Sequence, residues 1–114
     1  MYVTNTHKIQ KNKTPSGVSI WWLLTQENGT PHFELRYFEL EEGQKTSGNP
    51  HPFEHEVYVI KGRGQIAGDN EVVEIKPGDA VLIFPDERHQ FVNTGDEVLG
   101  FICIIPNGTE NHIK

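Results

Sequence analysis

Residues 78–93 read Gly78-Asp-Ala-Val-Leu-Ile-Phe-Pro-Asp-Glu-Arg-His-Gln-Phe-Val-Asn93. The apolar run Ala80–Phe84 ends at a Pro-Asp turn, and a second strand-like run begins at His89. Both runs are short and rich in β-branched or aromatic residues, a composition that favours strands over helices. The stretch therefore predicts a strand, a turn and a second strand.

The same pattern recurs on both sides of this stretch, and no window shows apolar residues sustained at helical spacing. Residues that favour turns, mainly Gly, Pro, Asn and Asp, separate the runs about every ten residues. We expect eight strands, near Val18–Leu24, His32–Leu40, His55–Lys61, Arg63–Ala67, Glu71–Ile75, Ala80–Phe84, His89–Asn93 and Val98–Ile105. With no helix to cover a sheet, such a chain should form an all-β jelly roll or small barrel.

The chain has 114 residues, which is long enough for one domain with a hydrophobic core. Its net charge is −6. Its single cysteine, Cys103, excludes an intramolecular disulfide framework. The acidic balance argues against a nucleic-acid or anionic-membrane surface, and no run is long enough to cross a bilayer. We expect a cytoplasmic protein with a polar N-terminal arm at 1–17, a barrel at 18–106 and a polar tail at 107–114.

Two neighbouring tryptophans, Trp21 and Trp22, fall within one expected strand. Successive strand residues point to opposite faces, so only one of the two can enter the barrel. A lone exposed aromatic residue is ordinary, but tryptophan is enriched at subunit interfaces. We therefore predict a homodimer.

Six histidines are an unusual number for this length, and three of them suggest a site: His51, His55 and His89. Four residues of extended chain span about 13 Å, whereas ligands of one metal lie roughly 3 Å apart. His51 and His55 can meet only if the chain folds back, and the prolines on both sides of His51 favour such a bend. Spacing alone leaves open that all three are surface loop residues.

Two stretches resemble the two motifs of the cupin superfamily: Gly48-Asn-Pro-His-Pro-Phe-Glu-His-Glu-Val-Tyr-Val-Ile-Lys-Gly62, and the stretch 78–93 quoted above. The resemblance covers about residues 30 to 106 and implies a double-stranded β-helix barrel. The nearest subgroup consists of small single-domain cupins, several of which bind manganese through four histidines. Phe84 and Asp86 depart from the second motif, where Pro and Gly are usual.

The resemblance implies one divalent transition metal held by His51, His55 and His89. His55 takes the place of the motif's Glu, and Asn49 replaces the first histidine of the motif. Asn49 would coordinate through its amide oxygen or leave its position to water, and Glu56 is an alternative carboxylate ligand. Manganese or iron is favoured, but imidazole ligands also suit nickel, zinc and copper.

Two further residues, Arg36 and Cys103, are expected beside this site. Arg36 is expected inside the barrel, either as an anchor for a substrate carboxylate or paired with Glu34. Cys103 shares its strand parity with Phe101 and Ile105, and we interpret it as a small apolar core residue. The remaining histidines, His7, His32 and His112, are expected at the surface.

Three functions remain open. The first is a metal-dependent enzyme that acts on a small oxygenated molecule, by oxygen-dependent oxidation or C–C cleavage, with isomerase or lyase chemistry next. The second is a module that binds a small molecule in the barrel without turnover, since no inward residue besides the ligands has an evident proton-transfer role. The third is a metal-free cupin in which Asn49 marks loss of the site.

Overall fold

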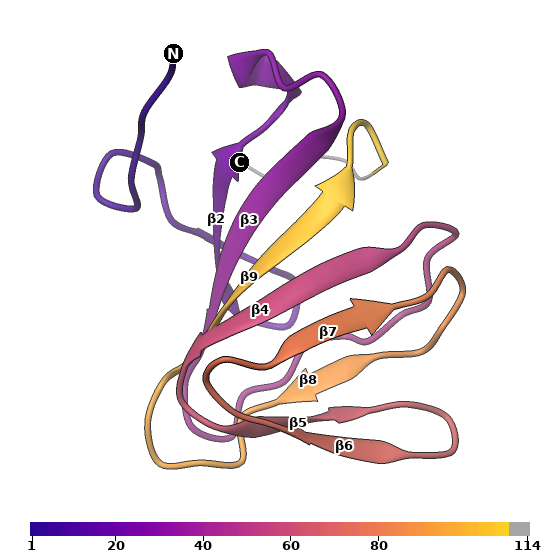
Figure 1. Ribbon diagram of the computed structural model, residues 1–114. Helices are drawn as coiled ribbons and strands as arrows, with labels where there is room; N and C mark the ends of the chain where they lie inside the picture. Colours follow the sequence, from indigo (N-terminus) through magenta and orange to yellow (C-terminus); the bar gives the residue numbers. More distant parts are fainter. Residues whose placement is uncertain (110–114) are drawn as a thin grey trace.

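The computed structural model describes residues 1–109, and these residues form two antiparallel sheets and one short 3-10 helix (Figure 1). His112 and the last five residues of the predicted tail lie outside the described residues. The elements are β1 (Asn12–Lys13), β2 (Ser19–Leu24), η1 (Gln26–Asn28), β3 (Phe33–Leu40), β4 (His55–Lys61), β5 (Gly64–Ala67), β6 (Val72–Ile75), β7 (Ala80–Ile83), β8 (Gln90–Val92) and β9 (Leu99–Pro106).

The two sheets form the walls of a single jelly roll. The larger sheet has the strand order β1-β2-β3-β9-β4-β7, and the smaller has the order β6-β5-β8. All strand pairs are antiparallel, and the longest register runs along β3 and β9, from Phe33 opposite Pro106 to Leu40 opposite Leu99. The predicted all-β single-domain barrel is confirmed.

The core lies between the sheets. Burial alternates along the strands because successive side chains point to opposite faces of a sheet. In β3 the buried positions are Glu34, Arg36, Phe38 and Leu40, while the residues between them are half-buried or exposed. Burying one face of each sheet removes apolar surface from water, which is the main favourable term in folding. The apolar core contains Val18, Ile20, Trp22, Phe38, Leu40, Val57, Val59, Ile66, Ile75, Ile83, Phe91, Leu99, Phe101, Cys103 and Ile105.

All eight predicted strands are present, each end within one residue of the predicted one, and the structure adds two elements. The two-residue strand β1 lies in the predicted N-terminal arm and pairs with Ser19 and Ile20. Such a short polar segment has no periodicity to predict it. The second is η1 between β2 and β3, which Thr25 caps and which ends at Gly29 with φ 92°.

Trp21 and Trp22 point to opposite faces of β2, as predicted. Trp22 is 6% exposed and belongs to the core, whereas Trp21 is half-buried on the outer face, where its ring contacts Tyr37. Among the described residues, no helix has the length and apolar character needed to span a membrane.

Candidate metal centre

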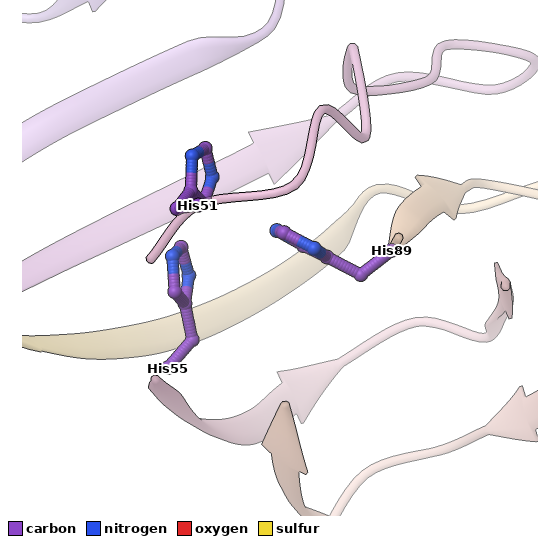
Figure 2. A group of neighbouring side chains, drawn as sticks. All are labelled: His51, His55 and His89. Carbon is purple, nitrogen blue, oxygen red and sulfur yellow. The ribbon is translucent and has the colours of Figure 1, made fainter. Parts of the chain in front are cut away.

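The three histidines singled out in the sequence come together (Figure 2). His51 lies in the loop before β4, His55 is the first residue of β4, and His89 directly precedes β8. One ring nitrogen from each lies within 4.8 Å of the others. Two ligands about 2.1 Å from one ion lie roughly 3 to 4.2 Å apart, so small side-chain rotations would bring all three onto a metal.

The loop that carries His51 folds back because its backbone is tied to the segment before β8. The His89 N–H donates to the carbonyl of Gly48 over 3.2 Å, and the Asp86 N–H donates to the carbonyl of His51. Gly48 is buried with φ 75°, and an added Cβ would lie 2.7 Å from the Cβ of Gln90. Asp86 adopts φ 66°, so an aspartate does occupy the left-handed position where the motif usually has glycine.

Hydrogen bonds and stacking orient the imidazole rings. His89 Nδ1 lies 2.7 Å from the carbonyl oxygen of Glu87, and since a carbonyl only accepts, Nδ1 carries the proton. That leaves the lone pair of His89 on Nε2, the arrangement that metal-bound histidines usually show. The ring of Phe53 stacks on those of His51 and His55 at centroid distances of 5.0 and 5.4 Å. Phe53 thereby limits the rotation of both imidazoles.

His55 is 5% exposed, and its environment keeps it neutral. Burial, followed by the positive charge of Arg36 and the two neighbouring histidines, lowers the pKa of His55 to about 2. Its Nε2 is buried and has no hydrogen-bond partner among the described residues. A buried polar nitrogen without a partner costs free energy, and a bound metal ion would satisfy it. The donor set and this nitrogen therefore fit a divalent transition metal, which binds neutral imidazole.

Arg36 and Cys103 lie directly beside His55. Arg36 Nη2 donates to Cys103 Sγ over 2.9 Å and lies 3.4 Å from His55 Nδ1, while Cys103 Sγ lies 3.3 Å from the same nitrogen. The guanidinium is packed between the rings of Trp22 and Phe38, at 5.4 and 5.1 Å from their centroids. Cys103 thus makes polar contacts at the site, which its interpretation as an apolar core residue missed.

The histidines and Arg36 line one cavity of about 480 Å³. Its wall is mainly apolar and includes five aromatic side chains, and no carboxylate lines it among the described residues. The N-terminal arm reaches the cavity at Thr14, Pro15 and Ser16, a contribution that nothing in the sequence pattern indicates. The aromatic residues of the wall are Trp22, Phe38, Phe53, Phe91 and Phe101.

Other predicted residues do not line the cavity. Asn49 is exposed and does not line the cavity, so its ligation receives no support from the structure and stays a prediction. Glu56 is exposed on the outer face of β4, opposite to His55 and outside the cluster. His7 and His32 are exposed, as predicted.

Residues 36–105 match the cupin domain family, and this range contains all three histidines. The chain belongs to the cupin family. The jelly roll also agrees with solved cupin folds: the polyketide cyclase RemF from Streptomyces resistomycificus superposes with a TM-score of 0.85. The two chains are 23% identical in sequence, and the superposed region covers 93% of this cupin and 79% of RemF.

Two curated relatives are more similar in sequence over shorter stretches. The 1-methylthio-D-xylulose 5-phosphate methylsulfurylase of Rhodospirillum rubrum is 39% identical over 72 residues, which are 63% of this cupin and 46% of that enzyme. The polyketide synthase CurC of Streptomyces cyaneus is 38% identical over 56 residues, 48% of this cupin and 36% of that protein. The cupin thus spans less than half of the length of either relative.

Proposed function

We propose that this cupin is a metal-dependent enzyme that acts on a small oxygenated compound bound in the barrel. His51, His55 and His89 hold one divalent transition metal, with manganese or iron favoured and nickel, zinc or copper as alternatives. The observation that carries the proposal is the buried His55 Nε2, which lacks a hydrogen-bond partner among the described residues and belongs to a cluster of three imidazoles.

The cavity supports a particular substrate class. Its volume of about 480 Å³ lies within the range of small-molecule sites, and its aromatic wall favours a ligand with an apolar or planar body. Three neutral imidazoles leave the charge of a divalent ion uncompensated, so the site favours an anionic or easily deprotonated oxygen group. Arg36 adds a second positive charge to the wall and would attract the same group.

The lining also bears on the reaction. When bound, the metal would polarise a substrate oxygen or activate dioxygen. No carboxylate lines the cavity among the described residues, so no Asp or Glu can act as a general base there. This absence favours oxygen-dependent oxidation or C–C cleavage, and it equally suits a module that binds without turnover.

Isomerase or lyase chemistry on the same centre is the second candidate. The sequence relatives support it, because their names, a methylsulfurylase and a polyketide synthase, describe chemistry other than the addition of oxygen. In that case Arg36 would stabilise the negative charge that forms on a substrate oxygen, since its guanidinium lies beside the imidazoles.

The metal proposal is tested by dialysing chelator-treated protein against Mn(II) or Fe(II) and measuring bound metal by mass spectrometry. We expect about one equivalent in the wild type and less than about 0.1 in His89→Ala. The exposed His32→Ala serves as the matched control and should bind like the wild type. Less than about 0.1 equivalents in the wild type would refute the centre.

The reaction is tested with the metal-loaded protein and small phenols, diketones and keto acids. Oxygen uptake that disappears in His89→Ala would support oxidation or cleavage, and product formation without oxygen uptake would support the isomerase or lyase. Quenching of tryptophan fluorescence by a compound that is recovered unchanged would favour the binding module and contradict an enzyme.

A further inference from the structure

The wall of the cavity carries hydroxyl groups that the candidate metal centre does not use. Among the described lining residues, Arg36 is the only lysine or arginine, and no carboxylate is present. A ligand group that lies away from the imidazoles and from Arg36 therefore meets hydroxyls rather than charges. The hydroxyl side chains of the wall are Thr14, Ser16, Thr46, Ser47 and Thr109.

Thr46 is held firmly against β8, the strand that directly follows His89. Its backbone N–H donates to the carbonyl of Phe91 over 2.9 Å, and its own carbonyl accepts from Gln90 Nε2 over 2.9 Å. Its hydroxyl oxygen accepts from the backbone N–H of Phe91, also over 2.9 Å. Backbone and side chain are thus fixed together, so a ligand meets a hydroxyl whose position is set before binding.

These bonds decide what the Thr46 hydroxyl offers to a ligand. A hydroxyl carries one proton and two lone pairs. The N–H of Phe91 occupies one lone pair, and no group among the described residues accepts the proton. An oxygen atom of a ligand in the cavity can accept this proton. An alkyl group in the same place displaces water and leaves the proton without an acceptor, which lowers affinity.

A second pair of hydroxyls, on the N-terminal arm, has the same preference for an acceptor. Thr14 Oγ1 accepts from the backbone N–H of Val18 over 3.2 Å and lies 2.9 Å from Ser16 Oγ. Whichever of these two hydroxyls donates to the other, one proton of the pair is left over. Gln44 Nε2 donates to the carbonyl of Gly17 over 3.2 Å, which ties this turn to the loop between β3 and β4 that carries the fixed hydroxyl.

The fixed hydroxyl lies at a distance from the histidines that a small ligand can span. The bridge between Lys45 and Val92 places Thr46 opposite Phe91, and Phe91 is two residues along the chain from His89. Two residues of a strand span about 7 Å. The ring of Phe91 lines the cavity between these points. A ligand that reaches both the metal and the hydroxyl thus carries two oxygen groups at opposite ends of a body about as long as a six-membered ring.

We propose that Thr46 is a specificity-determining residue that selects ligands with a second, uncharged acceptor oxygen, such as that of a ketone. The inference rests on the proposed function, in which the metal and Arg36 take an anionic oxygen group at the other end of the ligand. The substrate class is then an organic acid or phenol with a planar or apolar body and a carbonyl oxygen remote from the acidic group. Thr46 donates its proton to that carbonyl.

Two benzoates of similar shape test this selection by isothermal titration calorimetry on the Mn(II)-loaded full chain. 4-Acetylbenzoate carries the acceptor oxygen, whereas 4-isopropylbenzoate has a CH group in place of the carbonyl carbon and a methyl group in place of the oxygen. We expect the wild type to bind the acetyl compound at least about threefold more tightly, the effect of one net hydrogen bond. In Thr46→Val the two compounds should bind equally, and the isopropyl compound should bind no more weakly than in the wild type.

Two further variants separate the hydroxyl from the fold. Thr46→Ser keeps a hydroxyl and should keep the preference for the acetyl compound. Thr94→Val, at an exposed threonine that does not line the cavity, is the matched control and should behave like the wild type. A wild type that binds both benzoates equally, or a Thr46→Val variant that keeps the preference, would overturn the role of Thr46.

Metal bound in the same samples, measured by mass spectrometry, distinguishes this inference from the proposed function. A preference that disappears in Thr46→Val while metal stays bound supports the role of Thr46. The same preference in protein that retains no metal would refute the metal centre and still support Thr46. If the metal-loaded wild type binds neither benzoate, both the role of Thr46 and the anionic-ligand site of the proposed function are wrong.

Discussion

At the residue scale, Cys103 contacts both Arg36 and His55. Its sulfur accepts from Arg36 Nη2, and a metal on His55 Nε2 requires a proton on Nδ1, which the same sulfur can accept at 3.3 Å. One side chain therefore holds both the buried guanidinium and a ligand ring.

Replacing this sulfur should separate packing from hydrogen bonding. Cys103→Ala removes an acceptor of a buried charged donor and should cost about 1 to 3 kcal/mol of unfolding free energy. Cys103→Ser keeps an acceptor and should lose less. Urea denaturation of metal-free protein measures the order, and an alanine variant as stable as serine would show that the sulfur acts by volume alone.

Gly48 is the residue whose backbone conformation matters most for the position of the histidines. Gly48→Ala places an L-residue at φ 75° and a Cβ 2.7 Å from the Cβ of Gln90, so a loss above about 2 kcal/mol is expected. Gly43→Ala is the matched control, because Gly43 has φ 80° but an added Cβ meets nothing within 4 Å. Equal losses in the two variants, measured by urea denaturation, would mean that contact with Gln90 is unimportant.

At the scale of elements, the turn before β7 shows how a short polar segment positions a strand. Asp79 accepts from the backbone N–H of Lys76 over 2.9 Å and from Lys76 Nζ over 3.2 Å. These bonds, the backbone one first, lower the pKa of the Asp79 carboxyl in the folded chain. The turn closes between β6 and β7, in the segment that the sequence marks with Pro77 and Gly78.

A lowered carboxyl pKa gives the turn a defined pH dependence. Its contribution to stability is complete above the unfolded value of 3.8 and is lost as pH falls through the lower folded pKa. Asp79→Asn should therefore be less stable than the wild type at pH 7, and the gap should shrink at pH 3.5. Denaturation curves at both pH values measure it, and a gap that does not change with pH would disprove the role of the charge.

The presence of the strands, and the sheet face to which each side chain points, could be predicted from the sequence. Contacts between segments that are far apart in the sequence could not. Alternation predicted that only one of Trp21 and Trp22 enters the barrel and that Cys103 lies inside, and both predictions are confirmed. The fold-back at His51 was predicted from its two flanking prolines. The stacking of Phe53 on two imidazoles, and the entry of Thr14 into the cavity wall, depend on tertiary distances that no local pattern encodes.

At the scale of the molecule, the candidate metal centre joins the two sheets. His55 begins β4 of the larger sheet, whereas His89 leads into β8 of the smaller one, and His51 lies in the loop between β3 and β4. Unfolding separates these residues, because 33 positions lie between His55 and His89 in sequence. A metal that binds only the folded chain therefore stabilises both sheets together.

Metal loading should consequently raise the stability of the entire domain in one cooperative transition. At a free Mn(II) concentration of 100 times the Kd, mass action adds about 2.7 kcal/mol, which is a rise of roughly 10 to 20 °C in Tm for a domain of this size. Differential scanning fluorimetry with and without Mn(II) measures the rise, and excess chelator should reverse it. His89→Ala should melt at one temperature in both conditions, while His32→Ala should respond like the wild type. An equal rise in His89→Ala would place the stabilising metal elsewhere and contradict the three-histidine centre.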